Sequence, residues 1–261
     1  MSSTTSKTGA DRTVIVTGAT SGIGRATAEM FAKEGAAVLL TGRSEEALAD
    51  VAGRIRAGGG RAASYAADLL VADAADRIVG AAVHAFGGVD VLVNAAGIIA
   101  TGSIDTTTDD VWDQMMGINL TAPFRLMRAA APLLAARKGA IVNVSSVNGL
   151  RAFGGVLAYC VSKAALDHLT RCVALELAPS GVRVNAVNPG VTVTNLHRRS
   201  GMDEARYEAF LERSKETHPL GRPGQPEEVA SLILFLASNR AEWMTGETIP
   251  IDGGRHLTCL R

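Results

Sequence analysis

Short apolar runs alternate with longer stretches of helical period along most of the chain. The runs are four to six residues long and rich in β-branched residues, which is typical of buried strands. They lie at residues 13–17, 37–41, 61–66, 89–93, 140–145, 182–187 and 248–251. Such regular alternation predicts an α/β fold, with a doubly wound, mainly parallel sheet of seven strands and helices on both faces.

The stretches between these runs carry apolar residues at helical spacing. Helices are therefore expected from the end of a glycine-rich turn to residue 33, and at 45–55, 72–85, 108–136, 155–178 and 226–236. A polar segment, residues 192–223, interrupts the alternation, and part of it (202–216) again has a helical period. No repeat or linker divides the chain, so we expect one domain over residues 12–261, preceded by a disordered polar tail, residues 1–11.

Composition narrows the class of protein. The chain has 261 residues, of which 47% are hydrophobic and 20% charged, and its formal net charge is zero. Balanced charge argues against nucleic acid or an anionic membrane as a partner. No apolar run is long enough to span a bilayer, and the first residues lack a signal-peptide core. The three cysteines are widely spaced and suggest thiols of a reducing compartment: Cys160, Cys172 and Cys259. We therefore predict a cytoplasmic protein without a metal site.

A glycine-rich turn joins the first strand to the first helix. Glycine permits close backbone approach, and an open helix N-terminus suits a phosphate group. The spacing Gly-x-x-x-Gly-x-Gly differs from the common Gly-x-Gly-x-x-Gly, but the physical argument is the same. Turn glycines of an ordinary strand–helix junction are the alternative. We predict a dinucleotide phosphate site that involves Gly18, Ser21, Gly22, Ile23 and Gly24.

A serine, a tyrosine and a lysine follow the strand at 140–145. Ser146 ends the strand, Tyr159 comes thirteen residues later, and Lys163 lies four residues further, on the same face of a predicted helix. A free phenol has a pKa near 10, and a neighbouring ammonium lowers it toward the neutral range. The serine hydroxyl could hold a carbonyl oxygen in line with the phenol. The alternative is a core tyrosine beside a solvated lysine.

The chain resembles the short-chain dehydrogenase/reductase family, in its compact single-domain branch. The resemblance runs from about residue 12 to Gly254, with the motifs in the expected order: Thr17-Gly18-x-x-x-Gly22-x-Gly24, Asn94-Ala95-Ala96-Gly97, Asn119, Ser146 and Tyr159-x-x-x-Lys163. It implies an oxidoreductase that reduces a ketone or oxidises a secondary alcohol with a nicotinamide cofactor. Ala95 stands where the family usually has a second Asn, a position at which backbone contacts should survive the change.

The resemblance also implies roles for single residues. Tyr159 would be the general acid in reduction and the base in oxidation. Lys163 would lower the pKa of that phenol and bind the nicotinamide ribose. Ser146 would orient the carbonyl, and Asn119 would hold a water that links Lys163 to solvent, unless its side chain simply faces outward. Further cofactor contacts are implied for Asp68, Leu69, Asn94, Gly97, Pro189, Val191 and Thr194.

The end of the second strand bears on the choice of cofactor. A carboxylate there binds the ribose 2′-hydroxyl of NAD and repels a 2′-phosphate. This strand is followed by Arg43, whose guanidinium suits a phosphate, and Arg25 could reinforce it. Glu45 and Glu46 are the contrary observation, because either could reach a ribose. We favour NADP(H), with NAD as the alternative.

The substrate stays unassigned. By resemblance, residues 192–223 would form a lid over the substrate, where His197 is either a substrate ligand or, preferably, a surface residue. Arg137 and Lys138 stand where 3-oxoacyl carrier-protein reductases have a basic group, but Ser180 replaces an Arg expected before Gly181. A 3-oxoacyl-thioester reductase, acting on carrier-protein or CoA thioesters, is thus an alternative to a small-ketone enzyme. A non-catalytic nucleotide-binding scaffold is another.

Two helices carry more apolar surface than one buried face requires, those at 108–136 and 155–178. Family members pair these helices between subunits, so a homo-oligomer, tetramer or dimer, is expected. The end of the chain, residues 253–261, either crosses a subunit boundary or frays.

Overall fold

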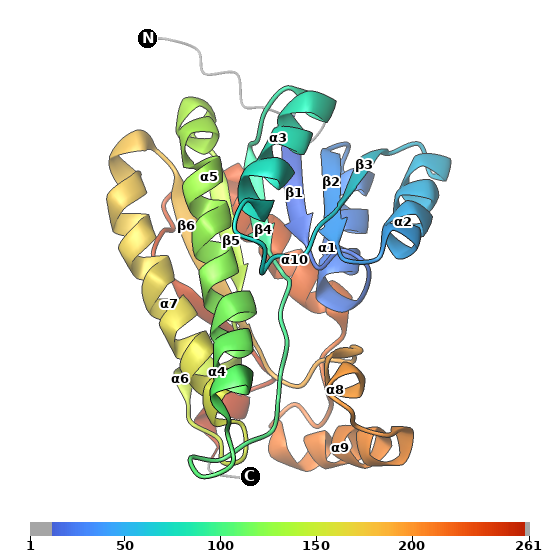
Figure 1. Ribbon diagram of the computed structural model, residues 1–261, viewed down its shortest axis with the longest axis vertical. Helices are drawn as coiled ribbons and strands as arrows, with labels where there is room; N and C mark the ends of the chain where they lie inside the picture. Colours follow the sequence, from blue (N-terminus) through green and yellow to red (C-terminus); the bar gives the residue numbers. More distant parts are fainter. Residues whose placement is uncertain (1–11, 259–261) are drawn as a thin grey trace.

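The strands form one parallel sheet (Figure 1). The computed structural model describes residues 12–258, and within this range seven strands lie in the order β3-β2-β1-β4-β5-β6-β7. They are β1 (Thr13–Thr17), β2 (Ala37–Gly42), β3 (Arg61–Ala66), β4 (Val91–Asn94), β5 (Ala140–Val144), β6 (Arg183–Pro189) and β7 (Thr248–Ile251). The predicted doubly wound α/β fold is confirmed, whereas the tail at residues 1–11 and Cys259 lie outside the described residues.

Helices cover both faces of the sheet because successive strand residues point to opposite sides. Val14 and Val16 pack against one group of helices: α1 (Gly22–Lys33), α2 (Glu45–Ala57) and α10 (Pro226–Ala237). Ile15 packs against the other group: α3 (Ala74–Phe86), α5 (Ala122–Arg137) and α7 (Leu157–Leu177). Figure 1 shows α3, α5 and α7 in front of the sheet and α1 and α10 behind it. The predicted boundaries of these elements differ from the observed ones by one or two residues.

The long helix expected at 108–136 is interrupted. It consists of α4 (Asp109–Met116), a π-helical turn η2 (Gly117–Thr121), and α5. A π-helical turn inserts an extra residue and changes which side chains face inward. Here it leaves Asn119 with no exposed surface, so the alternative in which Asn119 faces outward is wrong.

A short helix that was not expected, α6 (Val147–Leu150), directly follows Ser146. The Ser146 hydroxyl acts as its N-cap and accepts a hydrogen bond from the backbone N–H of Asn148 at 3.1 Å. Side-chain capping by serine favours a turn of helix at this position. The loop between Ser146 and Tyr159 is therefore ordered from its first residue.

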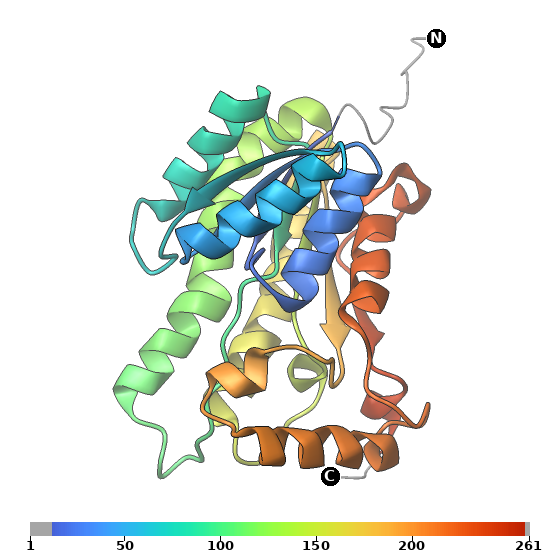
Figure 2. The same ribbon diagram turned by 90° about the vertical axis from the view of Figure 1, so that its right-hand side faces the viewer.

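The polar segment 192–223 contains two helices, α8 (Leu196–Arg199) and α9 (Glu204–Thr217). Figure 2 shows both of them lying across one end of the sheet. The helix expected within 202–216 is confirmed. The chain then returns through α10 and β7 to a short 3₁₀ turn, η5 (Arg255–Leu257).

The last described residues are held against the loop that precedes α7. The Arg151 guanidinium donates to the carbonyls of Arg255 at 3.3 Å and His256 at 3.1 Å, and also to that of Thr258. This part of the tail is therefore not frayed, and residues 259–261 lie outside the described range. Within residues 12–258, none of the helices is long and apolar enough to cross a membrane.

Candidate active site

The strand order reverses between β1 and β4, and the carboxyl ends of these two strands lie side by side. In doubly wound sheets, ligands bind at such a reversal, beyond the carboxyl ends of the strands. Most of the predicted site residues end or follow β1, β2, β3, β4, β5 or β6, so the fold places them along this edge, while Asn119 lies in η2 and Tyr159 and Lys163 lie on α7.

The glycine-rich turn after β1 is packed too closely for side chains. A Cβ atom at Gly18, where φ is +66°, would lie 2.9 Å from the Cα of Ala96. A Cβ atom at Gly24 would lie 2.4 Å from the carbonyl oxygen of Gly18. Both distances are shorter than real contacts, so glycine is required at these two positions. The turn thus lies directly against the backbone of the loop after β4.

Thr17 holds that loop. Its Oγ1 accepts hydrogen bonds from the backbone N–H groups of Ala95 at 3.0 Å and Ala96 at 2.9 Å. The loop is therefore fixed through its main chain, and the side chain at position 95 takes no part in these contacts. This is the physical reason why Ala95 can replace the second Asn of the family pattern.

Some helices have a side-chain N-cap, whereas α1, like α3 and α7, has none. Ser44, Thr108 and Asp203 cap α2, α4 and α9 by accepting a backbone N–H. Among the described residues, no side chain caps α1 in this way, and its first turn holds no acidic residue. The first N–H groups of a helix carry partial positive charge and need an acceptor. The glycine turn and this uncapped helix therefore fit a phosphate group.

Ser146, Tyr159, Lys163 and Asn119 come together beside this turn. Tyr159 is 6% exposed and is hydrogen-bonded to Ser146. The Lys163 ammonium lies 5.8 Å from the centroid of the Tyr159 ring and donates to the carbonyl of Val144 at 2.8 Å. A Cβ atom at Gly97 would lie 3.4 Å from Asn119 Oδ1 and 3.5 Å from Lys163 Nζ. Gly97 therefore lies directly beside both Asn119 and Lys163.

Burial dominates the titration of the pair. It raises the pKa of Tyr159 to about 12, although the hydrogen bond with Ser146 acts in the opposite direction. It lowers the pKa of Lys163 to about 8, and the negative charge of Asp167 opposes that shift. Desolvation disfavours the phenolate, and the Lys163 ammonium bonds to Val144 rather than to the phenol. The expectation that Lys163 lowers the phenol pKa therefore stays a prediction.

Both polar atoms of the Asn119 side chain form hydrogen bonds with the protein. Its Oδ1 accepts from the backbone N–H of Ile98 at 3.0 Å, and its Nδ2 donates to the Ile98 carbonyl at 2.9 Å and to Ser162 Oγ at 3.0 Å. These bonds tie the π-helical turn to the loop after β4 and to α7. Asn119 therefore fixes the relative positions of the elements that carry Gly97 and Lys163.

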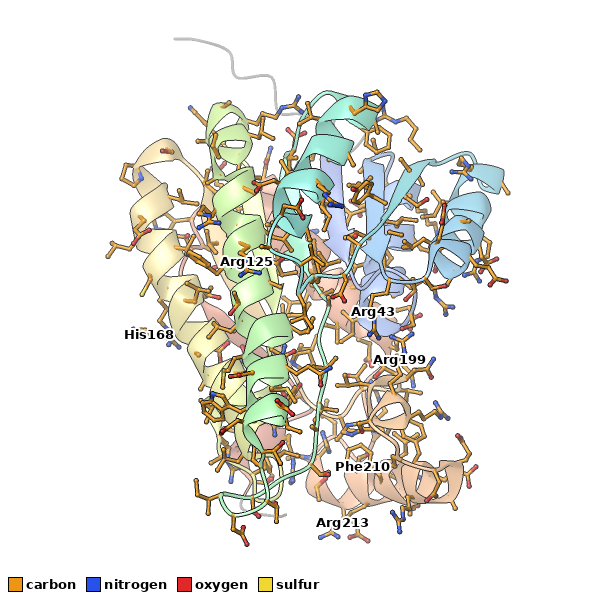
Figure 3. All side chains as sticks on the ribbon, in the orientation of Figure 1. Arg43, Arg125, His168, Arg199, Phe210 and Arg213 are labelled. Carbon is orange, nitrogen blue, oxygen red and sulfur yellow. The ribbon has the colours of Figure 1, made fainter. Side chains whose placement is uncertain are left out.

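The residues predicted to contact the adenosine half lie further along the same edge. Arg43 is exposed directly after β2, at the end of the sheet that faces α8 and α9 (Figure 3). Asp68 is exposed, and its carboxylate accepts the N–H of Leu70 at 3.0 Å, while Leu69 is half-buried. Arg25 forms an ion pair with Glu29 on the same helix, at 3.8 Å, so its positive charge already has a partner in the protein.

Asn94 lies at the centre of the site edge and is 2% exposed. Its Nδ2 donates to Asn143 Oδ1 at 2.8 Å. Its own Oδ1 is buried and has no hydrogen-bond partner among the described residues. Buried acceptors without partners are uncommon and mark places where a ligand or water can bind.

The loop after β6 brings Pro189, Val191 and Thr194 to this edge. The backbone N–H of Val191 donates to His218 Nε2 at 3.1 Å. The Tyr207 hydroxyl donates to the carbonyl of Thr194 at 2.9 Å and accepts from its N–H at 3.2 Å. Both partners, His218 and Tyr207, belong to the segment 192–223, the expected lid.

The sequence did not indicate these contacts of Tyr207 and His218. Tyr207 was visible only as an aromatic residue in a helical period, and no pattern singled out His218. The contacts join positions thirteen and twenty-seven residues apart, so only the tertiary fold reveals them. His197 was expected at the surface, but it is half-buried and packs against Phe210, with ring centroids 4.4 Å apart.

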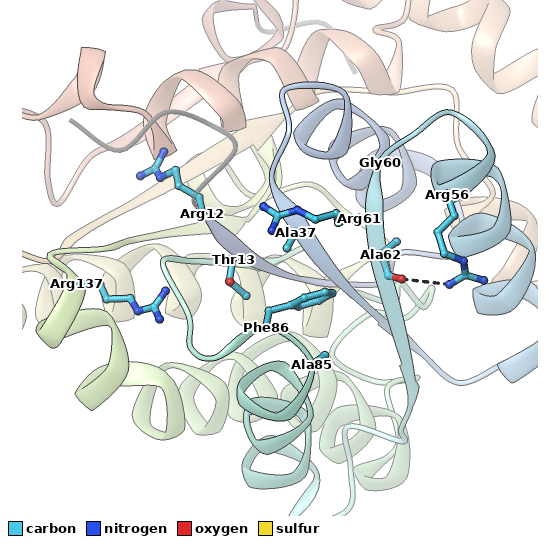
Figure 4. A pocket seen from close by; sticks show the side chains of 10 residues that line it. All are labelled: Arg12, Thr13, Ala37, Arg56, Gly60, Arg61, Ala62, Ala85, Phe86 and Arg137. Carbon is cyan, nitrogen blue, oxygen red and sulfur yellow. Dashed lines mark hydrogen bonds between the residues drawn. The ribbon is translucent and has the colours of Figure 1, made fainter. Parts of the chain in front are cut away.

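A hollow lies at the opposite, amino-terminal edge of the sheet (Figure 4). It has a volume of about 840 Å³, and its lining includes Arg12, Arg56, Arg61 and Arg137. Each guanidinium donates to the protein itself, three to the carbonyls of Ala237, Ala62 and Gly35, and Arg137 to Asp90. The arginines thus stabilise the fold at this edge.

Arg137 was considered as a group that could recognise a carrier protein. Its Nη1 lies 2.7 Å from Asp90 Oδ2, and its Nη2 donates to the Gly87 carbonyl at 2.8 Å. This ion pair is at the edge away from the site, and recognition of a carrier protein by Arg137 stays a prediction. Within residues 12–258, no three His, Cys, Asp or Glu residues gather in a group that could hold a metal ion.

Comparisons with known proteins agree with this arrangement. The sequence model of a family described as enoyl-(acyl carrier protein) reductase matches residues 18–256. A 2,5-dichloro-2,5-cyclohexadiene-1,4-diol dehydrogenase of Sphingobium indicum is 37% identical over 94% of this chain and 96% of its own. A 3-oxoacyl-[acyl-carrier-protein] reductase of Thermotoga maritima is 39% identical over 92% of this chain and 96% of its own.

A solved structure of a short-chain dehydrogenase/reductase of unknown function from Caenorhabditis elegans, determined with cofactor, superposes with a TM-score of 0.89. It is 38% identical and covers 95% of this chain and 96% of its own. The chain therefore belongs to the short-chain dehydrogenase/reductase family of oxidoreductases.

Proposed function

We propose that the protein is an NADP(H)-dependent oxidoreductase that interconverts a ketone and a secondary alcohol. The observation that carries the proposal is the meeting of Ser146, Tyr159 and Lys163 beside the uncapped N-terminus of α1. A nicotinamide cofactor would supply or accept the hydride when bound. The glycine turn and α1 would hold its phosphates, and the Pro189–Val191 backbone with Thr194 would hold its nicotinamide end.

The proton chemistry would belong to the chain itself. Ser146 Oγ would donate a hydrogen bond to the substrate carbonyl oxygen and so orient it. The Tyr159 hydroxyl would give its proton to that oxygen in reduction and take it back in oxidation. Because burial raises the pKa of Tyr159 to about 12, the phenol keeps its proton at neutral pH, which suits the reductive direction.

Lys163 and Asn119 would support this proton transfer. Positive charge at Lys163 would stabilise the phenolate left after the proton has gone. The side chain of Asn119 is occupied by Ile98 and Ser162, so the water-holding role falls to the main chain of the π-helical turn.

Cofactor preference rests on Arg43. It is exposed at the end of β2, where no carboxylate stands in the strand itself. Glu45 and Glu46 belong to the first turn of α2, whose N-cap is Ser44. A guanidinium here would bind a 2′-phosphate with charge-assisted hydrogen bonds, which is the reason to propose NADP(H) over NAD. Asp68 and Leu69 would contact the adenine.

We propose that residues 192–223 form the substrate lid. Helices α8 and α9 lie across the site end of the sheet, and His197 packs on Phe210 inside this segment. The substrate itself stays open. The 3-oxoacyl-[acyl-carrier-protein] reductase of Thermotoga maritima among the relatives supports acyl thioesters as the second candidate class.

We also propose a cytoplasmic homo-oligomer. Apolar side chains remain exposed on α5 and α7, with Phe124 and Val161 each 42% and Leu175 79% exposed. Such residues favour an interface between copies of the chain. Light scattering on the purified protein tests this. The wild type should have the mass of a dimer or a tetramer, and Leu175→Glu should reduce that mass. A monomeric wild type would contradict the proposal.

The activity is tested by following NADPH oxidation with a panel of ketones and 3-oxoacyl thioesters. Turnover of at least one compound by the wild type, and its loss in Tyr159→Phe, is the expected result. A protein that binds NADPH but turns over no compound of either class would instead support the scaffold alternative.

A further inference from the structure

His218 is a buried imidazole next to the proposed nicotinamide loop. It follows α9 and is 2% exposed. Its Nε2 accepts the backbone N–H of Val191 at 3.1 Å. Its Nδ1 lies 2.9 Å from the carbonyl oxygen of Ser214, which can only accept a hydrogen bond. Nδ1 therefore carries the proton, Nε2 is the acceptor, and the ring is neutral.

The loop has little freedom to move away from the ring. A Cβ atom at Gly190 would lie 2.9 Å from His218 Nε2 and 2.9 Å from the Cα of Asp252. The backbone N–H of Gly190 donates to the Ile251 carbonyl at 3.2 Å. The peptides of Gly190 and Val191 are thus enclosed between β7 and the imidazole, and His218 is the side-chain partner of Val191.

The charges around His218 favour its neutral form. Burial lowers the pKa of His218 below its ordinary value, and the positive charge of Arg255 lowers it further. The Ser214 carbonyl and the carboxylate of Asp252 act in the opposite direction. That carboxylate is also hydrogen-bonded to His256, and the Arg255 guanidinium donates to the Thr217 carbonyl at 3.2 Å. A second proton on the ring would place an N–H against the N–H of Val191 and break their bond.

We propose that His218 is a positioning residue for the nicotinamide half of the site, and that its protonation releases the Val191 peptide and weakens cofactor binding in acid. This rests on the proposed assignment of Pro189–Val191 to the nicotinamide end. The adenosine half, at Arg43 and α1, does not contact this loop through His218. Acid sensitivity should therefore be confined to the nicotinamide half.

Two probes separate the halves of the cofactor. NADPH needs both halves, whereas 2′,5′-ADP needs only the phosphate and adenosine contacts. His218→Leu removes the acceptor for Val191 and should raise the Kd of NADPH about tenfold, the effect of one lost hydrogen bond. It should leave the Kd of 2′,5′-ADP unchanged. His218→Gln retains an acceptor oxygen and should bind NADPH almost like the wild type at neutral pH.

The pH profile distinguishes positioning from simple packing. Because the pKa of His218 is lowered, the NADPH affinity of the wild type should weaken only as the pH falls below the ordinary histidine value, about 6.5, and by more than the affinity for 2′,5′-ADP. The glutamine of His218→Gln cannot be protonated, so the NADPH affinity of this variant should change with pH no more than its 2′,5′-ADP affinity does. His84→Leu, a change at an exposed histidine on α3, is the matched control and should behave like the wild type.

Three results would overturn the proposal. They are an equal loss of both probes in His218→Leu, no loss of NADPH in that variant, or an acid response in His218→Gln that equals the wild type's. If the wild type bound neither NADPH nor NADH, the proposed function itself would fail. A wild type that binds NADPH while the variants show no selective effect would remove only the role of His218.

Discussion

The two edges of the sheet use polar groups in opposite ways. At the amino edge, four arginines gather, and each of them donates to a carbonyl or a carboxylate of the protein. At the carboxyl edge, α1 lacks a side-chain cap and the Oδ1 of Asn94 has no partner among the described residues. A concentration of charge therefore does not by itself mark a functional site. Hydrogen-bonding groups without a protein partner, in a closely packed frame, mark it better.

The largest expected effect is at the carboxyl edge. Tyr159→Phe removes the proton donor but retains the buried ring, so turnover should fall about a hundred- to ten-thousandfold. NADPH affinity should stay nearly unchanged. Steady-state kinetics and a fluorescence titration on the same preparation check both statements, and retained turnover would remove Tyr159 from its role.

A substitution at the amino edge should lower the stability of the fold and leave NADPH binding unchanged. Asp90 is 2% exposed, and Arg137→Leu would leave its carboxylate without its closest guanidinium. We expect the free energy of unfolding to fall by about 2 kcal/mol, with NADPH affinity unchanged. Urea unfolding measures the first quantity. Adding Asp90→Asn to the same chain should restore part of the stability. If the folded Arg137→Leu variant bound NADPH more weakly, the proposed difference between the two edges would be wrong.

A smaller effect is expected at Arg43. Arg43→Ala removes charge-assisted hydrogen bonds to a 2′-phosphate, so the Kd of NADPH should rise about tenfold while that of NADH barely changes. Arg25→Ala is the control, because Arg25 already pairs with Glu29. Equal losses of NADPH and NADH in Arg43→Ala would refute the assignment of the 2′-phosphate.

The mildest test varies pH alone. Burial lowers the pKa of Lys163 to about 8, so its ammonium form, present below that pH, is lost as pH rises through it. Reductive turnover should therefore fall about tenfold between about pH 7 and about pH 9, while the phenol of Tyr159 keeps its proton. Asp167 raises the pKa of Lys163, so Asp167→Asn should move the decline to lower pH. A profile that is flat across this range would contradict the role of Lys163.

Much of the fold could be predicted because it depends on local pattern. Alternating apolar runs indicate a parallel sheet, and the spacing of Tyr159 and Lys163 places both on one face of α7. The direction of the Tyr159 pKa could not be predicted, because it depends on how deeply the phenol is buried. The roles of Tyr207 and His218 were also out of reach, since both arise from contacts between α9 and a distant loop. The π-helical turn at Asn119 has no signature in the apolar period that we could identify.

A titration of the purified protein with NADPH and NADH, followed by nicotinamide fluorescence, is the most direct test of the dinucleotide site. We expect saturable binding of NADPH, about tenfold tighter than that of NADH. Tighter binding of NADH would overturn the role of Arg43 but leave the oxidoreductase site in place. Binding of neither nucleotide would contradict the central claim that the carboxyl edge of the sheet is a dinucleotide site.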